Sequence, residues 1–128
     1  MTTTSAARLS NVNLLVQDVA RARDFYERAF GLVMDARRSA PPHMLILDAP
    51  GCTLSLKAEE TEDPAKREGP GSVELGFETE DLEAIHAALT ELGVFVTPIR
   101  EQGFGRTFDA RDPDGHHLVV YTLSAENR

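Results

Sequence analysis

Apolar and polar residues alternate along several short segments of the chain, and a helical spacing replaces this alternation twice. Val12, Leu14 and Val16 lie at every second position, which predicts a strand with one apolar face. Asp18 follows in the place of a helix N-cap, and apolar residues then recur every three to four positions. Gly31 suits the left-handed backbone that often ends a helix. We therefore predict a strand followed directly by a helix.

The same order of elements returns about sixty residues later, which indicates an internal repeat. Val73, Leu75 and Phe77 alternate with polar residues or glycine. Asp81 then stands at a second N-cap, and Gly93 at a second helix end.

Short apolar segments without helical spacing follow each predicted helix. These strand candidates lie at 32–36, 44–47, 52–57, 94–99, 106–111 and 116–123, and the polar segment 59–71 is predicted to be a linker. The chain is thus read as one domain, 1–128, made of two βαβββ modules at about 9–58 and 72–124. Because one helix covers only one face of a sheet, we predict an α+β fold. In it the paired modules form a concave mixed-sheet cup with the helices outside.

The strand faces turned away from the helices carry polar side chains. A solvated sheet face is the ordinary explanation of such a pattern. A concave face shared by two modules is instead a usual place for a ligand. The ligand-binding candidates on this face, or in the loop beside it, are Asn11, Asn13, Ser55, Lys57, Ser72, Glu74, Phe104, Asp109, His117, Val119 and Tyr121.

The amino-acid composition excludes some classes of binding partner. The formal net charge is −8, so the chain lacks the basic surface of a nucleic-acid-binding protein and would be repelled by an anionic membrane. The acidic excess weakly favours a cationic ligand. Cys52 is the single cysteine, which excludes an intrachain disulfide. We see no signal peptide or membrane-spanning run, and expect a cytoplasmic protein.

Two motifs carry a resemblance to a known family. The first is the segment 12–18 with Phe25-Tyr26 in the helix after it, and the second is Asp112-Pro113-Asp114-Gly115 before the last strand. Over residues 9–124 the chain resembles the vicinal oxygen chelate superfamily, also known as the glyoxalase/bleomycin-resistance/dioxygenase fold. The resemblance implies paired βαβββ modules and often a homodimer.

Many members of that family hold a divalent metal in the cup through His or Glu side chains from four strands. The corresponding positions here look like Asn11, Ser55, Ser72 and Val119, and none of them is His, Asp or Glu. We therefore expect no metal and no cofactor. The chain then resembles a metal-free branch that includes drug-binding resistance proteins. This implies a protein that binds a small organic molecule in the cup, with drug sequestration as a specific role.

Two enzymatic readings stay open. One is a metal-dependent lyase or dioxygenase of the same superfamily with unusual donors. The other is a metal-free isomerase or hydrolase-like enzyme in which Glu74 or His117 moves a proton. His116 and His117 are neighbours on a strand and point to opposite faces, so they cannot hold one ion together. We expect His116 to be an ordinary surface or turn residue.

Overall fold

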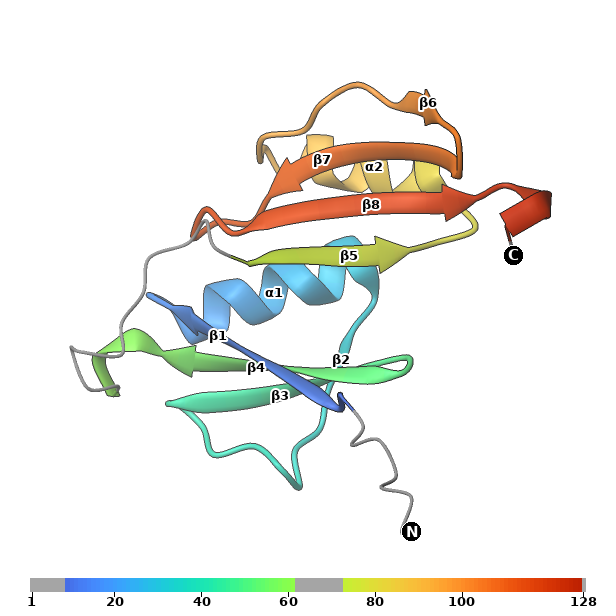
Figure 1. Cartoon of the computed structure of the whole chain (residues 1–128). Coiled ribbons are helices and arrows are strands. Elements are labelled where there is room, and N and C mark those ends of the chain that lie inside the picture. Colours follow the sequence, from blue (N-terminus) through green and yellow to red (C-terminus); the bar gives the residue numbers. More distant parts are fainter. Residues whose placement is uncertain (1–8, 62–72, 128) are drawn as a thin grey trace, which may run out of the picture.

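The computed structural model describes residues 9–61 and 73–127, which form two four-stranded mixed sheets, one from each half of the chain (Figure 1). The first sheet has the order β1-β4-β3-β2, and its strands are β1 (Asn11–Val16), β2 (Val33–Met34), β3 (Met44–Ala49) and β4 (Cys52–Ala58). The second has the order β5-β8-β7-β6, with β5 (Glu74–Glu78), β6 (Arg100–Gln102), β7 (Gly105–Arg111) and β8 (His117–Leu123). β1 pairs with β4 in parallel, and β5 pairs with β8 in the same way, so the first and last strands of each module along the chain are neighbours. The predicted α+β fold of two paired βαβββ modules is confirmed, and the sheets do not close into a barrel within the described ranges.

The helices begin and end where the sequence predicts. α1 (Val19–Phe30) starts after Asp18, whose carboxylate accepts a hydrogen bond from the backbone N–H of Arg21 at 3.0 Å. Gly31 ends it with a φ of 70°. α2 (Leu82–Glu91) is capped in the same way by Asp81. Neither of these helices is long and apolar enough to cross a membrane, as far as the chain is described.

One hydrophobic core runs through both halves. The predicted alternation is observed: Leu14, Val16 and Leu56 are buried in the first half, and Phe108 and Val120 in the second. Helix α1 packs on β3 and β4, and α2 packs on β7 and β8. Each helix thus packs on two strands of the sheet in its own half.

Helix α1 also joins the two halves. Figure 1 shows it between the sheets, and its Phe30 ring stacks on Phe77 of β5 with a centroid distance of 4.0 Å. The Tyr26 hydroxyl donates to the carboxylate of Asp112, 86 positions away, at 2.7 Å. The helix that covers the first sheet is therefore also a docking surface for the second half.

The prediction of a strand at 94–99 is wrong. Val96 makes only an isolated bridge to Ala110, and the third strand of this module is β6, at 100–102. Pro98 has no N–H to give to a ladder, and the Thr97 hydroxyl accepts from the Asp109 N–H at 2.9 Å. The predicted linker begins with the 3₁₀ helix η1 (Glu59–Thr61), and its remainder, 62–71, lies outside the described residues. A second 3₁₀ helix, η3 (Ala125–Asn127), ends the described chain.

Candidate functional site

A neutral polar cluster lies on the free face of the first sheet. The side-chain oxygen of Asn11 accepts hydrogen bonds from the hydroxyls of Thr53 at 2.6 Å and Ser55 at 2.9 Å. The Asn11 amide donates to Asn13 at 2.9 Å. The parallel register brings them together, because it pairs Asn11 with Thr53 and Asn13 with Ser55. The predicted Asn11, Asn13 and Ser55 thus meet, and Lys57 lies half-buried farther along β4.

A charged cluster lies on the second sheet. The His117 ring is 3.5 Å from a Glu74 carboxylate oxygen through Nδ1, and 3.3 Å from Asp109 through Nε2. Asp109 also pairs with Arg100 at 3.1 Å. β8 lies between β5 and β7, so it places His117 between the two carboxylates. The predicted Glu74, Asp109 and His117 therefore form one group, able to bind a polar ligand or move a proton.

Three further predicted residues have different surroundings. Val119 lies opposite Gly76 in the β5–β8 register. Tyr121 packs edge-to-face on Phe104 at 6.2 Å between ring centroids, and Phe104 is 40% exposed. The role of Phe104 in ligand binding stays a prediction. Ser72 lies outside the described residues.

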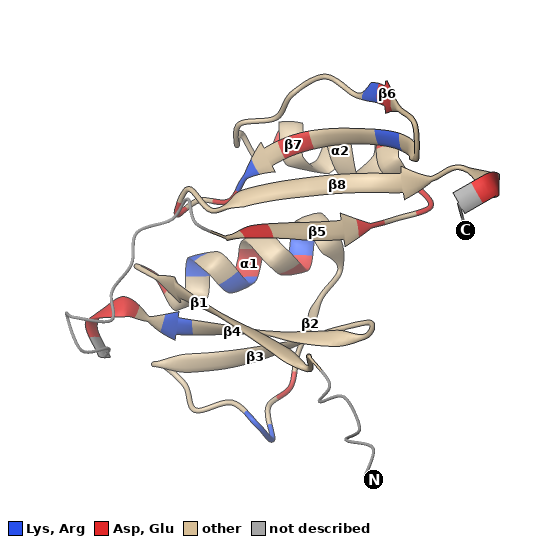
Figure 2. Cartoon of the chain, viewed as in Figure 1, with Lys and Arg blue, Asp and Glu red and all other residues tan. Residues whose placement is uncertain are grey.

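A cleft of about 710 Å³ lies between the two halves. Its apolar lining includes Val12, Phe30 and Leu54 from the first half and Leu75, Phe77, Ile85 and Tyr121 from the second. The charged residues among the described lining are Glu74 and Glu78, which colour both ends of β5 red in Figure 2. Alternation identified Phe77 as an apolar position of its strand, but alternation alone does not show that the two halves leave a space beside it.

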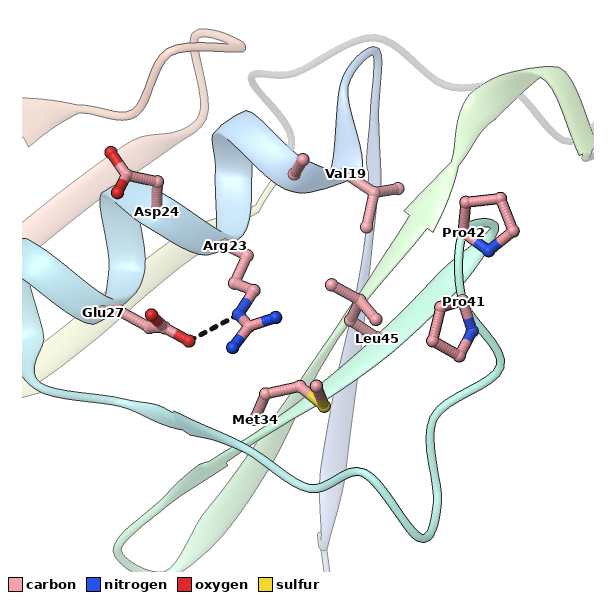
Figure 3. Close-up of a pocket in the computed structure, with 9 residues that line it drawn as sticks. Val19, Arg23, Asp24, Glu27, Met34, Pro41, Pro42 and Leu45 are labelled. Carbon is pink, nitrogen blue, oxygen red and sulfur yellow. Dashed lines mark hydrogen bonds and ion pairs between the residues drawn. The ribbon is translucent and has the colours of Figure 1, made fainter.

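A second hollow, of about 470 Å³, lies on the other side of α1, against the segment before β3 (Figure 3). Val19, Met34, Pro41 and Leu45 give it an apolar lining. At its rim the Arg23 guanidinium donates to Glu27 at 2.6 Å. None of the predicted site residues lines this hollow.

The turn between β7 and β8 holds a buried polar network. Asp112 is 4% exposed, and its carboxylate accepts from the Tyr26 hydroxyl and from the backbone N–H groups of Asp114 and His116. The His116 Nδ1 lies 2.7 Å from the same carboxylate. Four contacts thus hold Asp112 in one orientation.

These contacts shift three pKa values. Burial alone would raise the pKa of Asp112, but the hydrogen bonds from His116 and Tyr26 outweigh it and hold that pKa below its usual value. The hydrogen bond to Asp112 raises the pKa of His116 despite partial burial. Burial first, and the Asp112 charge second, raise the pKa of Tyr26 far above its usual value. Asp112 is therefore ionised and Tyr26 neutral at neutral pH.

The same turn corrects our expectation that the chain carries no cofactor. Asp112, Asp114 and His116 each offer a ligand atom, and these atoms lie within 4.8 Å of one another. Carboxylate oxygen and imidazole nitrogen are donors that divalent metals accept. His116 is also not an ordinary surface residue, since its side chain is only 12% exposed. The Asp-x-Asp-x-His spacing was the signal that we overlooked.

The positions named from the family resemblance suit a metal less well. Asn11 and Ser55 carry neutral side chains, and Val119 has no donor atom. Where donors are concerned, the turn fits a metal and these positions do not.

Comparison with known proteins gives a family and a fold. The model of the Glyoxalase/Bleomycin resistance protein/Dioxygenase superfamily matches residues 8–120. A search of the curated proteins finds no match to the chain.

Among solved structures, a "glyoxalase/bleomycin resistance protein/dioxygenase family enzyme" from Burkholderia phytofirmans PsJN superposes with a TM-score of 0.82 at 18% identity, over 92% of this chain and 100% of that one. The lactoylglutathione lyase from Agrobacterium tumefaciens gives 0.70 at 20% identity, over 93% and 96%. A "possible Glyoxalase" from Bacillus cereus gives 0.69 at 28% identity, over 91% and 99%. With the family model matching most of its length, the chain belongs to the Glyoxalase/Bleomycin resistance protein/Dioxygenase superfamily.

Proposed function

We propose that the chain, working as one domain of residues 1–128, binds a small, largely apolar organic molecule with a positive charge in the cleft between its two halves. The observation that carries this proposal is the cleft itself, about 710 Å³ and lined by aromatic and aliphatic side chains from both halves. Pockets of this volume with a few polar groups suit small-molecule ligands. Phe30, Phe77 and Tyr121 are the rings on which a planar ligand would lie.

The charge of the ligand follows from the lining. Glu74 and Glu78 lie four residues apart on the same face of β5, with Gly76 between them. A Cβ at Gly76 would lie 3.5 Å from the Tyr121 ring. The glycine therefore leaves the space beside that ring without a side chain. Two carboxylates beside apolar walls favour a cationic aromatic molecule. Sequestration of a basic drug is the specific role that we propose.

Titration with two dyes of opposite charge tests this proposal. Rhodamine 6G, a cationic aromatic dye, should bind with one dye per chain, and the anionic anilinonaphthalene sulfonate should bind at least tenfold more weakly. Replacing both Glu74 and Glu78 by Gln should weaken rhodamine binding about tenfold, since about 1.4 kcal/mol corresponds to a factor of ten. Raised salt should weaken it as well.

Glu101→Gln is the matched control, because Glu101 is exposed on β6 and does not line the cleft. It removes the same kind of charge and should leave rhodamine binding unchanged. Equal affinity for the two dyes, or an equal loss in the control, would contradict the proposal.

A second candidate function is catalysis, which the contact of His117 with Glu74 and Asp109 favours. An imidazole between two carboxylates can hold and pass a proton beside a bound substrate. A metal-dependent lyase or dioxygenase of the same superfamily stays the second form of this hypothesis. Lactoylglutathione, named by the Agrobacterium structure, is a suitable probe. Turnover that His117→Ala abolishes while rhodamine still binds would support catalysis, and no turnover with added divalent metals would contradict it for this probe.

The homodimer and the cytoplasmic location stay predictions. Exposed Phe95, at 58%, and Val73, at 49%, are apolar surfaces that a second copy would cover. Light scattering on the purified protein should give twice the chain mass of 14.0 kDa. A mass of one chain across micromolar concentrations would contradict the homodimer.

A further inference from the structure

We propose that the turn between β7 and β8 binds one divalent cation of the zinc type through Asp112, Asp114 and His116, and that this ion fastens the second half of the chain to α1. The turn lies outside the cleft lining, so the proposal is independent of the ligand proposed above.

The first observation is the close approach of three buried donors. Each residue offers one ligand atom, and these three atoms lie within 4.8 Å of one another. Asp112 is 4% exposed, and the side chains of Asp114 and His116 are 6% and 12% exposed. A cluster of exposed acids is common without an ion, but these three side chains are largely removed from water.

The second observation is an unsatisfied oxygen. Oδ1 of Asp114 accepts from the backbone N–H of Gln17 at 3.0 Å and lies 3.8 Å from the Arg21 guanidinium. Its Oδ2 is buried and has no hydrogen-bond partner among the described residues. A buried carboxylate oxygen without a partner is costly, and a cation in the turn would satisfy it.

The surrounding charges and donor types point to the kind of ion. Of the two buried carboxylates, that of Asp114 lies beside Arg21, whose side chain is 50% exposed and therefore compensates the charge weakly. A divalent ion would neutralise them directly. One imidazole with two carboxylates is a donor set for zinc or manganese, whereas magnesium and calcium prefer oxygen ligands alone.

The outer contacts of these donors explain what the ion would do. The Tyr26 hydroxyl orients the Asp112 carboxylate, and the Gln17 N–H orients that of Asp114. Both groups belong to the first half of the chain, next to or within α1. A cation held by the turn would therefore strengthen the docking of the two halves and stabilise the folded protein.

Calorimetric titration of chelator-treated full-length protein with zinc chloride tests the site. We expect one zinc per chain, a thermal unfolding midpoint that rises with zinc, and reversal of that rise by EDTA. Calcium and magnesium should bind at least tenfold more weakly. Asp114→Asn should weaken zinc binding at least tenfold, while Asp24→Asn, an exposed acid on α1, should leave it within twofold.

Three results would overturn the proposed zinc site. No saturable zinc binding, or a preference for calcium, would overturn the proposal. A loss caused by His117→Asn but not by Asp114→Asn would place the ion on the second sheet instead, and would overturn it too. Circular dichroism without metal shows whether Asp114→Asn folds, and His116→Gln serves as the second variant if it does not.

Discussion

Tyr26 shows how one side chain can serve both packing and polar contact. Its ring is fully buried and meets Phe25 edge-on with a centroid distance of 4.9 Å, while its hydroxyl reaches the Asp112 carboxylate at 2.7 Å. A buried carboxylate needs its donors, because an unmet acceptor loses the hydrogen bonds that it would have made to water. The hydroxyl therefore matters for stability separately from the ring.

Replacing Tyr26 by Phe should lower the free energy of unfolding by about 1–3 kcal/mol, because it keeps the ring and removes one donor to buried Asp112. Urea denaturation followed by circular dichroism measures this. Tyr121→Phe is the control, since the Tyr121 hydroxyl makes no hydrogen bond within the described ranges. Equal losses in the two variants would show that the hydroxyl contact is not what stabilises the turn.

At the scale of elements, the connection from β6 to β7 depends on one glycine. Gly105 has a φ of 149°, and a Cβ there would overlap the carbonyl oxygen of Thr122 on β8. Gly103, two residues earlier, has open space around the corresponding position. A side chain therefore has no room at Gly105, whereas it would have room at Gly103.

Gly105→Ala should destabilise the protein by about 1–3 kcal/mol, because a side chain there needs both a strained backbone and displacement of β8. Gly103→Ala should change stability by less than about 1 kcal/mol in either direction. The same urea denaturation compares them. If Gly103→Ala proved as costly as Gly105→Ala, loop flexibility rather than the Thr122 contact would be the cause.

At the scale of the whole molecule, aromatic contacts join the two halves. Phe30 at the end of α1 stacks on Phe77 of β5 with an interplanar angle of 15°, and Tyr26 lies 6.3 Å from Phe77 between ring centroids. The same two phenylalanines line the cleft. The surface that joins the halves is therefore also part of the proposed ligand site.

A double-mutant cycle of Phe30→Leu and Phe77→Leu should give a coupling of about 0.5–1.5 kcal/mol in unfolding free energy, as expected for an aromatic pair in contact. Phe30→Leu combined with Phe108→Leu is the control cycle, since Phe108 instead packs on His86 at 4.8 Å. Its coupling should be near zero. Couplings of the same size in both cycles would mean that Phe30 acts on the fold in general rather than through Phe77.

Much of the fold was predictable from local rules. The period of two at Leu14 and Leu56, and the caps at Asp18 and Asp81, are properties of short segments, so strands and helices lie where they were expected. The segment 94–99 was the exception. Its apolar residues led us to predict a strand, although Pro98 has no N–H to donate to a neighbouring strand.

The candidate site was predictable only in part. Strand parity correctly put Glu74, Asp109 and His117 on one face, because side chains alternate on every strand. It gave no sign that Phe77 borders a cleft, nor that His116 turns toward Asp112 rather than toward water. Both depend on neighbours that lie far away in the chain or on the shape of a turn.

The amino-acid sequence by itself determined the order of the elements, the repeat and the polar faces of the strands, because each rests on periodicity or on a cap within a few residues. Tertiary structure alone decided that Tyr26 and Gln17 meet the turn at 112–116, and that the two halves enclose an apolar cleft with two carboxylates. The reason is physical: these features arise from the packing of one half against the other, and no local pattern encodes the angle and distance at which two such halves dock.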